Sequence, residues 1–101
     1  MANHVNDYST TLAANTPVSI CPADGGCTLL IISNNGTGSL VWKAGSAPTS
    51  ATDGTPLDPA SGAGGQGGSI VLTGEAAISD QLFAWSTAGT TVNVKQGAKR
   101  P

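Results

Sequence analysis

Four large apolar residues stand in a row at Leu29, Leu30, Ile31 and Ile32, and this run constrains the fold more than any other feature of the sequence. Successive side chains of a β-strand point to opposite faces, so a strand with one solvated face alternates apolar and polar residues. If Leu30 and Ile32 face a core, Leu29 and Ile31 face the other way. The strand expected over residues 27–33 therefore needs cover on both of its faces.

Further strand signals recur at short spacing, separated by Gly, Pro, Asn and Asp, whereas helix signals are nearly absent. This pattern predicts an all-β fold, either a small β-sandwich or a jelly-roll-like barrel, with six to eight short antiparallel strands. Residues 3–10 form either a first edge strand or an extended arm, and residues 34–38 form a tight turn. The other expected strands lie at residues 16–21, 40–42, 69–73, 82–85 and 91–95.

The length of 101 residues fits one domain, which is interrupted by a distinctive segment at residues 45–68. Three prolines and a terminal glycine cluster predict a long loop there. Leu57 is the one large apolar side chain of the segment, so we expect it to anchor the loop to the core, with a short strand near Ala51–Leu57. The predicted organisation is an extended N-terminal arm at residues 1–15, a single β-sandwich domain at 16–97 and a C-terminal tail at 98–101.

Apolar runs at residues 70–72 and 82–85 repeat the problem of the 27–33 strand, because they also place large side chains on a second face. The simplest cover is another copy of the same chain, so we expect a homo-oligomer, with a trimer favoured and a dimer as the alternative. The other interpretation is that the loop of residues 45–68 folds back over the second face. The residues expected at an interface with another protein chain are Leu29, Ile31, Val71, Phe83, Val5 and Tyr8.

Charge is sparse, with a formal net charge of −2 and 10% charged residues. Soluble domains usually carry about a quarter, and a weakly charged surface suits burial against other protein. The 4 Lys and Arg residues are too few to neutralise a run of phosphates, so nucleic acid is not an expected partner. The sequence contains neither a membrane-length apolar run nor a secretion signal, so we expect synthesis in a cytoplasm and no membrane partner.

The sequence offers no residue set for catalysis, cofactor binding or metal binding, so we expect a protein that is not an enzyme. His4 is the single histidine, and most of the carboxylates stand in turn sequences. Cys21 and Cys27 flank the turn at residues 22–26 but lack the further ligands that a zinc site needs. They are either reduced thiols or a disulfide across a hairpin.

Two tryptophans, Trp42 and Trp85, each end an apolar run. A tryptophan on a strand is typical of a buried core residue. An exposed tryptophan could instead stack on a sugar ring, so glycan binding is an alternative role for these two residues.

After the apolar strand, the chain carries the segments ISNNGTGSLVWKAG, TDGTPLDP, GGSIVLTG and DQLFAWSTAGTTVNVKQG in that order. This order resembles the small β-sandwich virion proteins of tailed bacteriophages, and the likeness covers most of residues 28–97. The chain departs from the family pattern in two ways. The glycine-rich stretch at residues 61–68 lengthens the loop, and the cysteine pair is extra.

The resemblance implies a structural role as a head decoration or cement protein, which binds the outer capsid lattice and often sits as a trimer. The expected partner is then the major capsid protein, and the expected location is the exterior of the virion, after synthesis in the host bacterial cytoplasm. The alternative is a tail or fibre component that acts in attachment or binds host-surface glycans. For the decoration role, the arm of residues 2–15 is expected to order on the partner and add a strand to its sheet.

Overall fold

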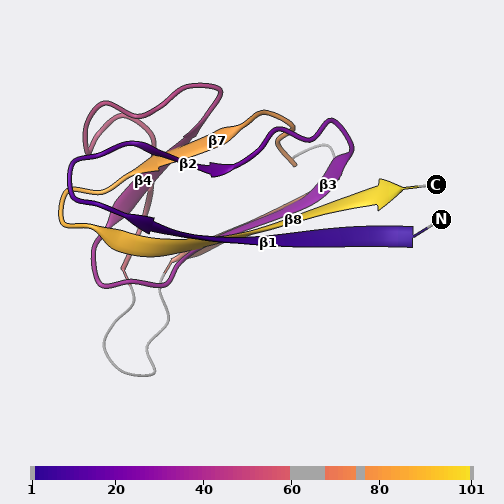
Figure 1. The fold of residues 1–101 in the computed structure, drawn as a ribbon, viewed down its shortest axis with the longest axis horizontal. Helices are drawn as coiled ribbons and strands as arrows, with labels where there is room; N and C mark the ends of the chain where they lie inside the picture. Colours follow the sequence, from indigo (N-terminus) through magenta and orange to yellow (C-terminus); the bar gives the residue numbers. More distant parts are fainter. Residues whose placement is uncertain (1, 60–67, 75–76, 101) are drawn as a thin grey trace.

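The fold is an all-β sandwich, as the sequence predicts (Figure 1). The computed structural model describes residues 2–59, 68–74 and 77–100, so residues 60–67 of the expected long loop lie outside the described residues. The described residues form eight strands in two antiparallel four-stranded sheets. Within these ranges, no helix combines the length and the apolar character that crossing a membrane requires.

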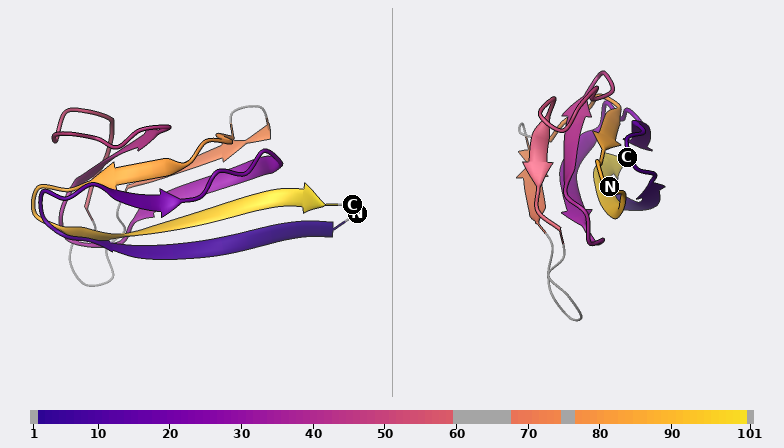
Figure 2. Two further views of the ribbon diagram at one scale, coloured as in Figure 1. Left: turned by 45° about the horizontal axis from the view of Figure 1, so that its top comes forward. Right: turned by 90° about the vertical axis from the view of Figure 1, so that its left-hand side faces the viewer.

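The first sheet has the strand order β1-β8-β3-β6 and joins the two ends of the chain. β1 pairs with β8 along all of its 11 residues without a register shift. The segment expected as an arm or an edge strand is therefore an edge strand of the chain's own sheet. Figure 2 shows β1 and β8 side by side, with both termini at one end of the molecule. The bounds are Ala2–Leu12 for β1, Cys27–Asn34 for β3, Ser69–Thr73 for β6 and Thr90–Arg100 for β8.

The second sheet has the strand order β2-β7-β4-β5 and consists of shorter strands. The pairing of β2 with β7 shifts register between Ser19 and Cys21. The short β5 has 3 residues and lies within the stretch Ala51–Leu57, where the sequence predicts a short strand. The bounds are Val18–Cys21 for β2, Leu40–Ala44 for β4, Thr55–Leu57 for β5 and Leu82–Trp85 for β7.

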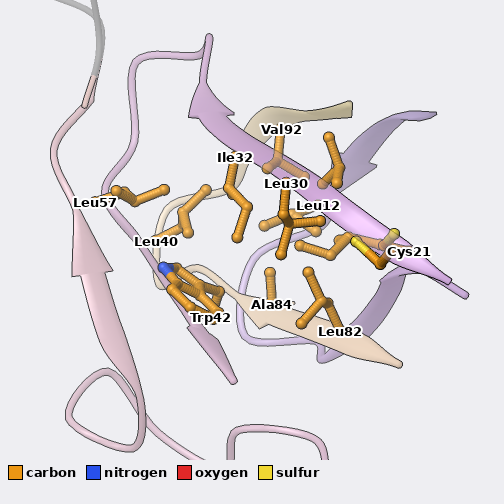
Figure 3. Close-up of a cluster of buried hydrophobic side chains, with 13 residues drawn as sticks. Leu12, Cys21, Leu30, Ile32, Leu40, Trp42, Leu57, Leu82, Ala84 and Val92 are labelled. Carbon is orange, nitrogen blue, oxygen red and sulfur yellow. The ribbon is translucent and has the colours of Figure 1, made fainter. Parts of the chain in front are cut away.

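The core lies between the two sheets and is built from alternate residues of each strand. Leu30 and Ile32 are both 0% exposed, as predicted, and Figure 3 shows them directed toward Trp42 and Ala84 of the opposite sheet. Leu57 is buried in the same core, so its predicted anchoring role is confirmed. Each large side chain fully buried here contributes about 1.5–3 kcal/mol relative to exposure. The core also contains Leu12, Ile20, Leu40, Leu82, Val92 and Val94.

One buried amide, that of Asn34 at the end of β3, joins segments from both sheets. Its Nδ2 donates hydrogen bonds to the carbonyl oxygens of Gly38 at 2.8 Å and Leu57 at 3.2 Å. Its Oδ1 accepts from Thr90 Oγ1 at 2.7 Å and from the backbone N–H of Gly36 at 3.3 Å. Both donors and both acceptor positions of the amide are occupied, which removes the cost of burying it.

The described part of the long loop is tied to β4 by a network around Asp53. Lys43 Nζ lies 3.0 Å from Asp53 Oδ1. Asp53 Oδ2 accepts hydrogen bonds from the backbone N–H of Thr49 at 3.0 Å and from its hydroxyl at 3.2 Å. The hydrogen bond from Lys43, followed by that from the Thr49 backbone, holds the pKa of Asp53 below its ordinary value. The turn at residues 49–53 is therefore fixed beside the second sheet.

This loop covers the outer face of β4. Gly54 has φ = +151°, and a Cβ at this position would lie 2.7 Å from the carbonyl oxygen of Trp42 and 3.3 Å from Cβ of Val41. Only glycine allows so close an approach of the two backbones. Val41, on the outer face, is 5% exposed, and Pro48 is fully buried. The loop therefore covers a strand of the second sheet, whereas the strand for which the sequence predicts a second cover, β3, lies in the first sheet.

Candidate interaction surface

The outer face of the first sheet brings together four of the six residues expected at an interface. Residues that pair across antiparallel strands share a face, so the register gives the arrangement directly. From β1 through β8 and β3 to β6, one row contains Val5, Gly97, Leu29 and Thr73, and the next contains Asp7, Lys95, Ile31 and Val71. The three aliphatic residues of β3 and β6 are therefore direct neighbours in this arrangement.

We call Leu29, Ile31 and Val71 the apolar half of this outer face. Val71 is 58% exposed, whereas Leu29 and Ile31 are half-buried. Val5 is 57% exposed and lies in the row of Leu29, on the far side of Gly97. Among the described large hydrophobic residues, Val5 and Val71 are the two exposed ones, and both lie on this face. The described part of the chain thus leaves the second face of β3 partly open.

The β1–β8 half of the same face is polar and internally paired. Lys95 Nζ lies 2.9 Å from Asp7 Oδ2, and Asn93 Nδ2 donates to Asp7 Oδ1 at 2.5 Å and to Ser9 Oγ at 3.0 Å. The hydrogen bond from Lys95 is the main reason that the pKa of Asp7 lies below its ordinary value. Both charged side chains are about half exposed, so this ion pair adds little to stability. It presents balanced charge beside the apolar half.

The remaining two predicted interface residues lie elsewhere. Tyr8 is on the inward side of β1, half-buried and packed against the core. Phe83 is half-buried on the outer face of the second sheet, where it pairs in register with Ser19 and Lys43. The structure therefore does not bring Tyr8 or Phe83 into the apolar half.

The two tryptophans occupy different environments. Trp42 is 6% exposed, and its Nε1 is buried with no hydrogen-bond partner among the described residues, so this side chain belongs to the core. Trp85 is half-buried and lines a shallow hollow of about 330 Å³ together with Val41, Pro56 and Thr87. Charged side chains are absent from this lining, which consists of Trp85, aliphatic residues and the hydroxyl residues Ser39 and Thr87. Glycan stacking at Trp85 stays a prediction.

Cys21 and Cys27 are free, buried thiols. Burial is the main cause that raises the pKa of Cys21 to about 11, and it also raises the pKa of Cys27. Thiols with raised pKa values are weak nucleophiles near neutral pH. Across the described ranges, no three His, Cys, Asp or Glu side chains gather in a way that could hold a metal ion.

Comparison with known proteins adds one distant structural likeness. No family model matches the sequence, and no curated protein matches it. A solved chain from work on Bacillus endospore appendages, which form a novel family of disulfide-linked pili, is 14% identical and has a TM-score of 0.49. The match covers 99% of this chain and 88% of that chain. This likeness is too distant to bear on function.

Sequence reasoning missed the polar neighbours that frame the apolar half. The Asp7–Lys95 contact joins residues 88 positions apart, and Gly97 separates Val5 from Leu29 only because β8 lies between β1 and β3. No local pattern encodes these pairings. The alternation within residues 91–95 was the available signal, since it placed Asn93 and Lys95 on the solvent side of a strand.

Proposed function

We propose that this chain is a structural virion protein of a tailed bacteriophage, a head decoration or cement protein that binds the assembled capsid and stabilises it. The observation that supports the proposal is the apolar half of the outer face, Leu29, Ile31 and Val71. A cluster of aliphatic side chains that stays partly exposed and is bounded by paired polar groups is typical of protein interfaces. The sequence resemblance supplies the kind of partner, the major capsid protein.

The proposed role needs no chemistry beyond binding. A protein that binds the assembled shell and not its separated subunits stabilises the shell by mass action, by about 2.7 kcal/mol per site at a free concentration 100 times Kd. The hydroxyl and amide side chains on the β1–β8 half of the outer face can form hydrogen bonds at the rim of the contact with the capsid. In this role the chain acts as a homo-oligomer on the virion exterior and is not an enzyme.

The experiment is co-sedimentation of the purified chain with heads assembled in its absence. We expect saturable binding at many copies per head and a higher temperature for head opening. Val71→Lys should weaken binding at least 10-fold, because it places a charge in the apolar half at an exposed site that folding does not need. Thr87→Lys, at an exposed site beyond the end of β7, is the matched control and should bind normally.

Failure of the wild-type chain to bind heads would overturn the proposal. Binding at a few copies per particle, confined to tails, would replace it with the attachment role. Equal binding by the two lysine variants would show that the apolar half is not the contact surface.

A further inference from the structure

The free edge of β1 differs from the other three sheet edges of the sandwich. The first sheet ends at β1 and β6, and the second ends at β2 and β5. β6 has 5 residues, β2 has 4 residues and a register shift, and β5 has 3 residues including Pro56, which has no N–H to donate. These are the usual devices that keep an edge from pairing with another chain.

β1 shows none of these devices. It runs for 11 residues in unbroken register with β8 and contains no proline, glycine or lysine. Every second residue of an edge strand directs its N–H and C=O groups away from the sheet. Along β1, about five residues therefore present an unpaired N–H and an unpaired C=O group to a partner strand. An edge of this length and regularity can take one more strand.

A groove of about 390 Å³ follows the same edge and lies between β1 and β2. Its lining includes Tyr8 and Thr10 from the inward side of β1, and Ile20 and Cys21 from β2. Ile20 and Cys21 are each 2% exposed, so they form the floor of the groove. A strand added beside β1 would direct alternate side chains into this groove and the others onto the outer face, beside Val5.

We infer that the partner at this edge is a second copy of the chain, whose β1 pairs antiparallel with the first β1 about a two-fold axis. This inference deepens the proposed function, on which it rests, by naming the occupant of one surface. A two-fold axis places two copies of β1, which have equal length, side by side. Most side chains of each copy carry hydroxyl or amide groups, which can donate and accept hydrogen bonds across the contact.

Charge supports a second copy as the occupant. The one acidic side chain of β1, Asp7, is already paired with Lys95 of its own chain, so the approaching strand brings balanced charge. Residues directly opposite in an antiparallel pair share a face. The two copies of Asp7 therefore face each other only in the register centred on Asp7, and every other two-fold register keeps them apart.

The test is sedimentation velocity of the full chain between about 1 and 100 μM. We expect a reversible monomer–dimer equilibrium, with a dimer of twice the 9.9 kDa chain mass. Ser9→Lys with Thr11→Lys, both at exposed β1 sites, should weaken the dimer at least 10-fold, since lysines along an edge oppose pairing. Ser69→Lys with Thr73→Lys, at exposed sites on the opposite edge of the same sheet, is the matched control and should leave the dimer intact.

Hydrogen exchange supplies a readout that is independent of variant folding. Half of the β1 amides should gain protection as the wild-type concentration rises through the dimer dissociation constant. A monomer throughout the range, a trimer, or a dimer lost in the β6 variant and kept in the β1 variant would overturn the inference. Head binding by a monomer would leave the capsid-binding role standing and would remove only the proposed dimer. A dimer that does not bind heads would remove the capsid-binding role and leave the proposed dimer standing.

Discussion

Replacing Asn34 by alanine should destabilise the fold more than any substitution at an exposed site. The amide makes four hydrogen bonds, to Gly38, Leu57, Thr90 and Gly36, and its side chain is fully buried. A neutral hydrogen bond contributes about 1 kcal/mol net, so the loss of four predicts about 4 kcal/mol. The partners left without hydrogen bonds act in the same direction. For a chain of this length, the loss corresponds to a fall in Tm of about 15–20 °C.

Equilibrium unfolding in urea, followed by tryptophan fluorescence, measures this loss. Asn35→Ala is the matched control, because Asn35 is the adjacent, exposed asparagine and should lose less than about 0.5 kcal/mol. Thr90→Val, which keeps the shape and removes one donor, should lose about 1 kcal/mol. A loss below about 1 kcal/mol for Asn34→Ala, or equal losses for the two asparagine variants, would refute the reasoning, since each hydrogen bond is assigned that much.

Three further predictions concern the loop and the thiols. Asp53→Asn should speed proteolytic cleavage within residues 45–54, because it removes the charge that holds the turn; unchanged cleavage rates would argue against this tether. The pKa of Cys21 is raised to about 11 in the folded chain, so the folded chain holds this proton more tightly than the unfolded chain does. The contribution of Cys21 to the free energy of unfolding should therefore be fully present below about pH 8.5 and be lost as pH rises toward 11. Cys21→Ala should flatten that fall in urea titrations, and an unaltered slope would contradict the assignment. Gly54→Ala should cost about 1–3 kcal/mol in thermal melts, while Gly25→Ala, which meets no atom within 4 Å, should cost little.

The fold class was predictable because the strand signals are local. Residues 27–33, 69–73 and 82–85 are short apolar runs between turn residues, and each forms a strand close to the expected bounds. The buried pair Leu30 and Ile32 followed from side-chain alternation alone. Such features need no knowledge of what each strand pairs with.

The pairing of the termini could not be predicted in the same way. β1 is mostly polar, and β8 continues past the alternating residues 91–95 to Arg100. The two strands pair residues from opposite ends of the chain, and no local pattern encodes which residues lie opposite each other. Asn34 illustrates the same limit. Its local sequence predicts only a turn, whereas its amide forms hydrogen bonds with Leu57 and Thr90, which belong to strands distant in the sequence.

The two sheets differ in how their outer faces are covered, and the sequence could not assign this difference. On the second sheet, the loop segment around Gly54 covers Val41. On the first sheet, no described residue does the same for Val71, which stays 58% exposed. No local pattern in the sequence states which sheet the segment around Gly54 packs against.

Hydroxyl-radical footprinting of the chain, free and bound to heads, tests the central claim most directly. The account predicts that Leu29, Ile31 and Val71 lose most of their labelling when the chain binds, while Trp85 on the second sheet keeps its own. Undiminished labelling of these three aliphatic side chains on saturated heads would contradict it.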